Sequence, residues 1–183
     1  MSFAGVLCPF GDTVRDLVRE QSGEPSIDAD PVVVAEEEAR GARNAAIAHL
    51  IASYGNLDHS VDLVLGHYDR ACALRMSCGD LALAATFLAR HGVGRGGVRL
   101  LSRSDAKRVN AVMLTSGTYD AAGEFAYRVG LPGKSGVSGG LLAIVPGRCA
   151  LCAWSPRVDA AGNSIAAVAA LDAFTTLSGW SVF

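Results

Sequence analysis

The apolar residues of the first two thirds of the chain recur mostly at three- and four-residue intervals, which place side chains on one face of a helix. This spacing predicts a helix over 11–22, with Asp12 as its cap, and a longer helix over 31–55, which a proline opens and a glycine ends. We expect Asp58 to cap the next helix, which runs to Met76. Further helices are expected over 78–91, 104–114 and 121–129.

The pattern changes at Leu131. Two apolar runs follow, one on either side of Pro146-Gly147, and this arrangement predicts a β-hairpin. A polar turn at 159–163 then precedes a final amphipathic helix over 164–177. Helices, then a hairpin, then one more helix is the element order of an α+β fold.

The composition narrows the class of protein. Of the 183 residues, 50% are hydrophobic and 19% are charged, which is typical of a globular domain rather than a disordered chain. The net charge of −2 argues against a nucleic-acid partner, because phosphate binding requires a clustered basic surface. No apolar run reaches the roughly 18 residues of a membrane-spanning helix, and the N-terminus lacks the basic start of a signal peptide. We therefore expect a cytoplasmic protein without a membrane partner.

The five cysteines are odd in number and scattered, which favours reduced thiols over a disulfide framework. Cys149 and Cys152 form a C-x-x-C motif of the kind that binds metals. Their segment has the apolar character of a strand, however, and residues three apart on a strand face opposite sides. No second ligand pair follows at a suitable spacing. We therefore expect core thiols, no metal site and no cofactor.

The run Lys134-Ser135-Gly136 precedes an apolar strand, as the K-T-G or K-S-G strand does in serine acyl-transfer enzymes. In such a site Lys134 would supply a cation near a substrate carboxylate, and Ser135 would supply a hydroxyl donor. Gly136 would let a substrate lie close to the backbone, and the amide of Val137 would point at a developing oxyanion. Enzymes of this kind pair the strand with a nucleophilic S-x-x-K motif.

Two other motifs have ordinary structural explanations. Ser104 and Lys107 form the S-x-x-K of this chain, but a serine ahead of Asp and Lys at a helix start is typical of an N-cap, and we do not expect it to be the nucleophile. The glycine-rich segment 92–97 follows a predicted helix rather than a strand, and no G-K-[ST] completes it. We interpret that segment as a connector rather than a phosphate-binding loop.

Longer motifs occur in a defined order along the chain: EEEARGARNAAIAHL, GHYDRACALRMSC, NAVMLTSGTYDAAGEFAYRVGLPGKSGVSGG, LLAIVPG and SPRVDAAGNS. Together they resemble the serine-dependent glutaminases over residues 10–183 and leave 1–9 unmatched. The resemblance implies a β-lactamase/transpeptidase-like fold and the hydrolysis of L-glutamine to L-glutamate and ammonia. A penicillin-binding or β-lactamase relative is the alternative on K-S-G alone, and the E-x6-N and S-G-x-Y-D motifs argue against it.

The resemblance also assigns site residues. On spacing alone, Glu37 and Asn44 would be polar residues of a helix, Tyr68 a core aromatic and Tyr119 a turn aromatic. The resemblance implies instead that Glu37 binds the α-amino group of the substrate and that Asn44 lies against its α-carboxylate. It implies that Tyr68 and Tyr119 are catalytic and substrate-binding hydroxyls around the reacting carbonyl. It further implies that the backbone of Val137 contacts the substrate and helps to form the oxyanion hole.

The nucleophile itself is expected outside this chain, because the resemblance implies that the S-x-x-K of the family lies upstream of Met1. We therefore expect the C-terminal portion of a glutaminase, truncated at its N-terminus and either inactive alone or dependent on a separate N-terminal half. The alternative is a non-catalytic remnant that binds glutamine or glutamate, or that pairs with other subunits. The family forms homo-oligomers, and a sheet without its N-terminal strands would leave apolar edges that favour association.

Overall fold

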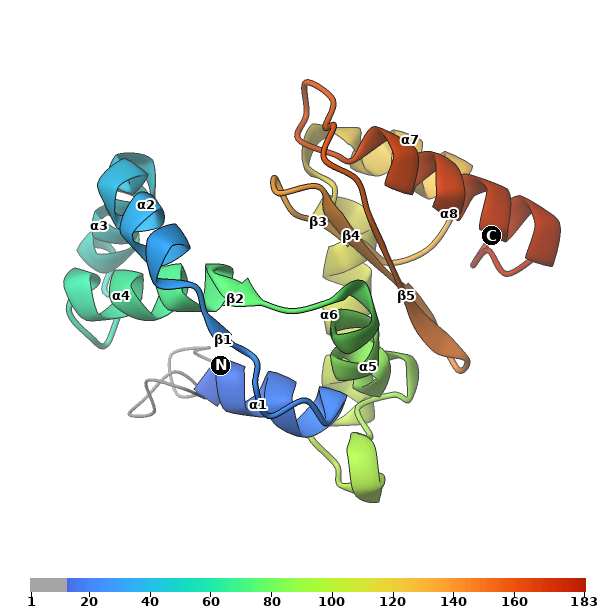
Figure 1. Cartoon of the computed structure of the whole chain (residues 1–183), viewed down its shortest axis with the longest axis horizontal. Coiled ribbons are helices and arrows are strands. Elements are labelled where there is room, and N and C mark those ends of the chain that lie inside the picture. Colours follow the sequence, from blue (N-terminus) through green and yellow to red (C-terminus); the bar gives the residue numbers. More distant parts are fainter. Residues whose placement is uncertain (1–12) are drawn as a thin grey trace. The chain divides into compact units, whose positions relative to one another are not determined.

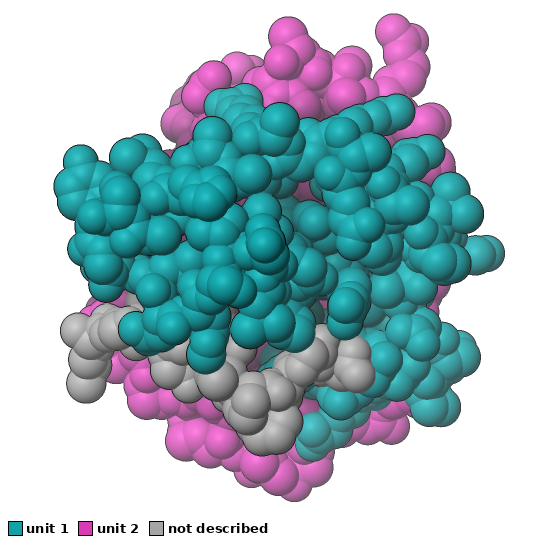
Figure 2. All heavy atoms as spheres, turned by 90° about the vertical axis from the view of Figure 1, so that its left-hand side faces the viewer, with its two compact units in different colours: residues 1–20, 24–76 teal, residues 21–23, 77–183 magenta. Residues whose placement is uncertain are grey.

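The computed structural model describes residues 13–183, which form helices and short antiparallel strands (Figure 1). The chain divides into two compact units, which Figure 2 shows in different colours. Unit 1 comprises residues 1–20 and 24–76, and unit 2 comprises residues 21–23 and 77–183. The predicted cap Asp12 and the unmatched segment 1–9 lie outside the described residues.

Unit 1 is mainly helical. A short antiparallel pairing of Asp28 with Arg75 and of Ala29 with Leu74 joins strands from its beginning and its end. Three helices lie between these strands in the sequence, and α4 packs against both α2 and α3 (Figure 1). The elements are α1 (Thr13–Ser22, whose last two residues belong to unit 2), β1 (Asp28–Ala29), α2 (Pro31–Arg40), α3 (Ala42–Ser53), α4 (Val61–Cys72) and β2 (Leu74–Arg75).

The single helix expected over 31–55 is wrong, because the chain forms two helices there. α2 ends at Arg40 and α3 begins at Ala42, and Gly41 lies between them as the cap of both. A glycine in a helix interior costs about 0.5–1 kcal/mol relative to alanine, so the break falls where continuation of the helix is weakest. The predicted opening is confirmed, since Pro31 is the first residue of α2.

Two predicted caps are also corrected. Ser60 rather than Asp58 caps α4, and Ser102 rather than Ser104 caps α6. In both cases the serine directly precedes the helix, and its hydroxyl accepts a hydrogen bond from the backbone N–H of the third helical residue. An N-cap side chain must stand at this position to reach that N–H, which Asp58 and Ser104 do not.

Unit 2 combines helices with a three-stranded sheet. The predicted hairpin is confirmed as β4 and β5, which are joined by the turn at Pro146-Gly147, and the predicted final helix is confirmed as α8. The elements are α5 (Cys78–Ala89), η2 (Arg95–Gly97), α6 (Arg103–Ser116), η3 (Tyr119–Ala121), α7 (Ala122–Arg128), β3 (Gly133–Ser135), β4 (Gly140–Val145), β5 (Cys149–Trp154) and α8 (Ile165–Ser178).

The sheet has the order β3-β4-β5, and both pairings are antiparallel. On one face, α7 and α8 cover a buried cluster that includes Phe125, Leu141 and Leu171, and on the other face α5 and α6 pack over Ile144 (Figure 1). Burial of a Leu, Ile or Phe side chain stabilises a fold by roughly 1.5–3 kcal/mol. The two clusters therefore hold the K-S-G strand β3 between helices on both faces. Along residues 13–183, no helix has the length and apolar character needed to cross a membrane.

Candidate active site

The end of α6 meets the strand β3 at Gly117. A side chain at this position would place its Cβ 1.8 Å from the carbonyl oxygen of Gly133, so only glycine permits the approach. At this contact the backbone N–H of Ser135 donates to the carbonyl of Gly117 over 2.9 Å. The glycine of the S-G-x-Y motif therefore brings the turn that carries Tyr119 against the K-S-G strand.

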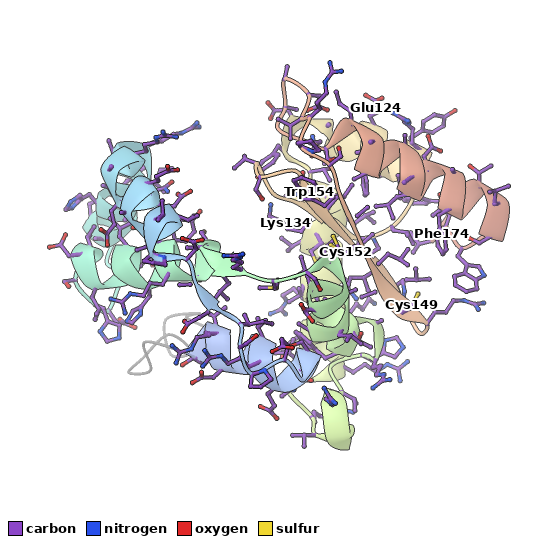
Figure 3. The ribbon with its side chains drawn as sticks, viewed as in Figure 1. Glu124, Lys134, Cys149, Cys152, Trp154 and Phe174 are labelled. Atoms are coloured by element: carbon purple, nitrogen blue, oxygen red, sulfur yellow. The ribbon has the colours of Figure 1, made fainter. Side chains whose placement is uncertain are left out.

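Tyr119 and Lys134 converge on one carbonyl group. The hydroxyl of Tyr119 donates to the carbonyl oxygen of Ser135 over 3.2 Å, and the ammonium of Lys134 donates to the same oxygen. The ammonium also lies 4.7 Å from the centroid of the Tyr119 ring, within the range of a cation–π interaction. Figure 3 shows Lys134 on the same sheet as Cys152 and Trp154 of β5.

The backbone of Tyr119 has a left-handed conformation, with φ of 56°. Residues other than glycine rarely adopt this conformation, and where they do the surrounding structure must hold them in it. The side chain is 41% exposed although its hydroxyl is anchored on β3. Tyr119 is thus a fixed phenol whose ring remains accessible from solvent.

The structure corrects the expectation that Ser135 offers its hydroxyl to a substrate. Ser135 is 1% exposed, and its hydroxyl donates to the carbonyl of Gly162 over 3.4 Å. The side chain of the middle residue of K-S-G therefore ties β3 to the turn at 159–163. The backbone carbonyl of Ser135, rather than its hydroxyl, accepts the hydrogen bonds from Tyr119 and Lys134.

Val137 lies in a tight loop directly after β3. Gly136 donates to the carbonyl of Gly140 over 2.8 Å, and Gly139 donates to the carbonyl of Gly136 over 2.9 Å. Among residues 13–183 no group accepts a hydrogen bond from the N–H of Val137, and its side chain is 72% exposed. A preorganised amide of this kind is what an oxyanion hole requires.

The structure brings Tyr119 and Val137 together around Gly162. A Cβ built on Gly162 would lie 3.5 Å from the ring of Tyr119 and 3.6 Å from the side chain of Val137. Gly162 has a φ of 89°, a conformation that favours glycine. The predicted polar turn at 159–163 is confirmed, and it lies between the two predicted site residues of unit 2.

The other three predicted site residues belong to unit 1. Glu37 lies on α2 and Asn44 on α3, both half-buried, whereas Tyr68 lies on α4 and is about half exposed. The next residue, Asp69, is buried. Burial raises the pKa of the Asp69 carboxyl, and the charges of Glu37 and Glu38 raise it further. Carboxylates from α2 and α4 therefore create a negative potential in this unit.

Asp69 is a residue that the sequence analysis missed. It stands four residues after Leu65 and three before Cys72, on the apolar stripe from which the helix 61–76 was predicted. A charged residue on the apolar stripe of an amphipathic helix is a detectable signal, because burial of a carboxylate is costly and rarely occurs without a reason.

The S-x-x-K of this chain lies at the start of α6. Ser104 and Lys107 are both exposed, and they follow the actual cap Ser102. Neither side chain approaches Tyr119 through any hydrogen bond or ion pair among residues 13–183. The structure thus brings the K-S-G strand and a phenol together, and the S-x-x-K at 104–107 is part of a solvated first helical turn.

Cys149 and Cys152 face opposite sides of β5, as predicted. Cys149 packs beside the cluster beneath α7 and α8, whereas Cys152 contacts Cys78 at the start of α5. Burial raises the pKa of the Cys152 thiol to about 12, and the neighbouring Cys78 adds to the effect. Both residues of the motif are half-buried. No group of three or more potential metal-ligating side chains is found along residues 13–183.

Comparison with known proteins gives one consistent match. A sequence model of the glutaminase family matches residues 10–183. A glutaminase of Streptomyces coelicolor is 60% identical over 176 residues, which are 94% of this chain and 57% of that protein. A glutaminase of Pseudomonas fluorescens is 51% identical over 172 residues, which are 93% of this chain and 57% of that protein. The chain therefore spans a little over half the length of these relatives.

Solved structures agree with the sequence match. The crystal structure of the Bacillus subtilis glutaminase YbgJ superimposes with a TM-score of 0.85 at 30% identity, over 92% of this chain and 60% of that one. It is a covalent complex with 5-oxo-L-norleucine, formed by reaction of that protein with 6-diazo-5-oxo-L-norleucine. This similarity confirms the predicted α+β, β-lactamase/transpeptidase-like fold class.

Proposed function

The chain belongs to the glutaminase family, and on that premise we propose that it provides the substrate-binding and oxyanion-stabilising part of an enzyme that hydrolyses L-glutamine to L-glutamate and ammonia. One observation carries the proposal. The S-G-x-Y turn and the K-S-G strand meet, so that the Tyr119 hydroxyl and the Lys134 ammonium share the carbonyl of Ser135.

The chemistry of amide hydrolysis fits the groups in unit 2. A serine nucleophile attacks the side-chain amide of glutamine, and negative charge develops on the amide oxygen. We assign the stabilisation of that charge to the N–H of Val137, which donates to no group among residues 13–183. We assign to the phenol of Tyr119 the transfer of the serine proton to the amide nitrogen, which leaves as ammonia. Water then hydrolyses the acyl-enzyme and releases L-glutamate and the serine.

Recognition of the amino-acid end of the substrate is assigned to unit 1. We assign the α-amino group to Glu37 and the α-carboxylate to Asn44, and the hydroxyl of Tyr68 to the reacting end. The gathered carboxylates of Glu37, Glu38 and Asp69 support this assignment, because they attract an ammonium group. A chain with this potential discriminates L-glutamine from a simple amide without an α-amino group.

The nucleophile is assigned to a segment outside these 183 residues. The relatives are considerably longer than this chain, and the Ser104 and Lys107 pair lies exposed at the start of α6. On the family resemblance, we infer that the part of the Streptomyces coelicolor relative that this chain does not match carries the S-x-x-K motif. A polypeptide with that part, bound to this chain, would complete the site.

Ammonia release tests the proposal. The chain is mixed with that polypeptide and with L-glutamine, and Tyr119→Phe is compared with Tyr127→Phe, which alters an exposed tyrosine on α7. We expect turnover by the mixture, a loss of about 10²-fold or more in Tyr119→Phe, and full activity in Tyr127→Phe. Equal activity of the two variants would rule out the role assigned to Tyr119.

The alternative is a non-catalytic subunit that binds glutamine or glutamate. The solvated S-x-x-K on α6 favours it, because residues 13–183 then hold no S-x-x-K nucleophile beside Tyr119. Calorimetry and the ammonia assay together distinguish the alternative from the proposal. The alternative predicts that the chain alone binds L-glutamine in calorimetry and that the mixture releases no ammonia. Ammonia release by the mixture above that of either part would exclude the alternative.

A cytoplasmic location and a homo-oligomeric state complete the proposal. The half-buried and reduced thiols on β5 are compatible with a reducing compartment. β5 is an edge strand of six residues, and such an edge offers unpaired backbone groups to a second chain. Light scattering on the purified chain tests the association: a mass above that of one chain supports it, and a strictly monomeric mass argues against it.

A further inference from the structure

Several hydrogen bonds hold the turn at 159–163, which lies beside Tyr119. The Asp159 carboxylate accepts from the N–H groups of Ala161 and Asn163, each over 2.9 Å. The backbone N–H of Asp159 donates to the carbonyl of Asn163 over 2.8 Å. These bonds fix the position of Asn163, whose side chain is 1% exposed.

The side chain of Asn163 reaches the peptide group that leads into Tyr119. Its Nδ2 donates to the carbonyl oxygen of Thr118 over 3.2 Å. This carbonyl and the N–H of Tyr119 belong to one rigid peptide plane. The orientation of that plane determines φ of Tyr119, which has the uncommon left-handed value of 56°. Asn163 is therefore bonded to the group whose rotation would release Tyr119 from its conformation.

Thr118 and Asn163 have no second hydrogen bond between their side chains. Thr118 Oγ1 and Asn163 Oδ1 are both buried without a hydrogen-bond partner in the part of the chain that the structure describes. The link between the turn and the peptide before Tyr119 therefore depends on the bond from Asn163 Nδ2 to the Thr118 carbonyl.

We propose that Asn163 is a positioning residue for Tyr119, because its Nδ2 holds the Thr118 carbonyl. This contact keeps the peptide plane before Tyr119 fixed, so that the phenol stays on the Ser135 carbonyl beneath Lys134. The catalytic meaning of this position rests on the proposed function, but the position itself is measurable without turnover.

The chain contains a matched control for this role. Asn110 is also buried, its Nδ2 donates to a backbone carbonyl, that of Leu88, over 3.2 Å, and its Oδ1 lacks a protein partner. It lies on α6 and bonds to α5, away from the turn at 159–163. Replacement of either asparagine by alanine removes the same bonds from a buried position. Only Asn163→Ala is expected to affect Tyr119.

The experiment measures whether the Tyr119 ring remains under the Lys134 ammonium. The four tyrosines are labelled as 3-fluorotyrosine, and Tyr119→Phe assigns the ¹⁹F resonance of Tyr119. Lys134→Met should shift this resonance, because the ammonium lies 4.7 Å from the ring centroid. The shift is then measured again in the Asn163→Ala and Asn110→Ala backgrounds.

We expect Lys134→Met to retain its full effect in Asn110→Ala and to lose at least half of it in Asn163→Ala. An equal effect in both backgrounds overturns the proposal. If Asn163→Ala gives the resonances of an unfolded chain, Asn163→Leu is measured in the same way, since it removes the Nδ2 donor and keeps a side chain of similar size. A partial loss in Asn163→Leu supports the proposal, and full retention overturns it.

The outcome is independent of the proposed reaction. A loss of the Lys134 effect together with an inactive mixture would leave the positioning intact and remove the catalytic assignment. Turnover by the mixture, with an unchanged Lys134 effect in Asn163→Ala, would leave the catalytic assignment intact and overturn the positioning role of Asn163.

Discussion

The contact of Gly117 with β3 can be tested by Gly117→Ala. The added Cβ would lie 1.8 Å from the carbonyl oxygen of Gly133 and 2.5 Å from that of Met113. Both are backbone atoms, so no side-chain rotation relieves the overlap. The end of α6 and β3 must move apart by more than 1 Å to restore ordinary contact, which breaks the 2.9 Å hydrogen bond from Ser135 to Gly117.

The expected cost has two parts. Overpacking in a dense interior costs about 1–3 kcal/mol. A buried N–H left without an acceptor costs about 1–3 kcal/mol more, and Ser135 is fully buried. The free energy of unfolding should therefore fall by roughly 2–6 kcal/mol, a large part of the 5–15 kcal/mol typical of a domain. The midpoint of thermal unfolding should fall by about 5–20 °C.

Urea denaturation followed by circular dichroism measures this change, with Gly123→Ala as the control. Gly123 lies on α7, and a Cβ built there meets no atom within 4 Å. The control should gain about 0.5–1 kcal/mol, because alanine favours a helix. If Gly117→Ala stays within about 0.5 kcal/mol of the unmodified chain, the close approach of α6 to β3 is wrong and with it the placement of Tyr119.

Three further predictions concern charges and thiols. The pKa of Asp69 is raised by burial and by Glu37 and Glu38, so the folded chain should lose stability as pH rises from about 4 through that pKa, whereas Asp69→Asn should not. A difference in urea midpoint between the unmodified chain and Asp69→Asn that stays constant from about pH 4 to pH 7 would contradict this prediction. Arg128→Met removes a half-exposed ion pair with Asp172, so the free energy of unfolding measured in urea should fall by less than about 1 kcal/mol, and by still less in 1 M salt. A larger loss that does not depend on salt would show that the pair is not a screened surface interaction. Because the pKa of Cys152 is about 12, iodoacetamide at pH 8 should alkylate this thiol at least 100-fold more slowly in the folded chain than in urea. Peptide mass mapping measures the two rates, and equal rates would contradict the burial of Cys152.

The sequence was sufficient where a single local rule decides the structure. The hairpin turn at Pro146-Gly147, the polar turn at 159–163 and the opening of α2 at Pro31 follow from turn and helix preferences, and all three are present. The caps Ser60 and Ser102 were not predicted because a second polar residue, two positions away, is an equally suitable cap in each case. Only the backbone conformation shows which of the two precedes the helix directly. The sequence alone does not show whether Gly41 weakens one long helix or separates two helices, because the outcome depends on packing.

The contacts of the candidate site could not be predicted from the sequence, and the roles of its residues remain predictions. The motifs identify Tyr119 and Lys134, yet their common acceptor is a backbone carbonyl, and no sequence pattern distinguishes it from the hydroxyl of Ser135. Asn163 belongs to the SPRVDAAGNS motif, but a polar residue next to a glycine is typical of an ordinary turn and does not indicate a buried role. Its burial against Thr118 depends on contacts between residues 45 positions apart. Long-range contacts of this kind are absent from the local pattern.

Covalent labelling tests the central claim most directly. The chain, the complementary polypeptide from the Streptomyces coelicolor relative, and their mixture are each treated with 6-diazo-5-oxo-L-norleucine, the reagent that reacts with the Bacillus subtilis relative. Mass spectrometry then locates the adduct. We predict no adduct on either part alone, and an adduct in the mixture on the serine of the added S-x-x-K segment. An adduct on this chain, at Ser104 or elsewhere, would contradict the account.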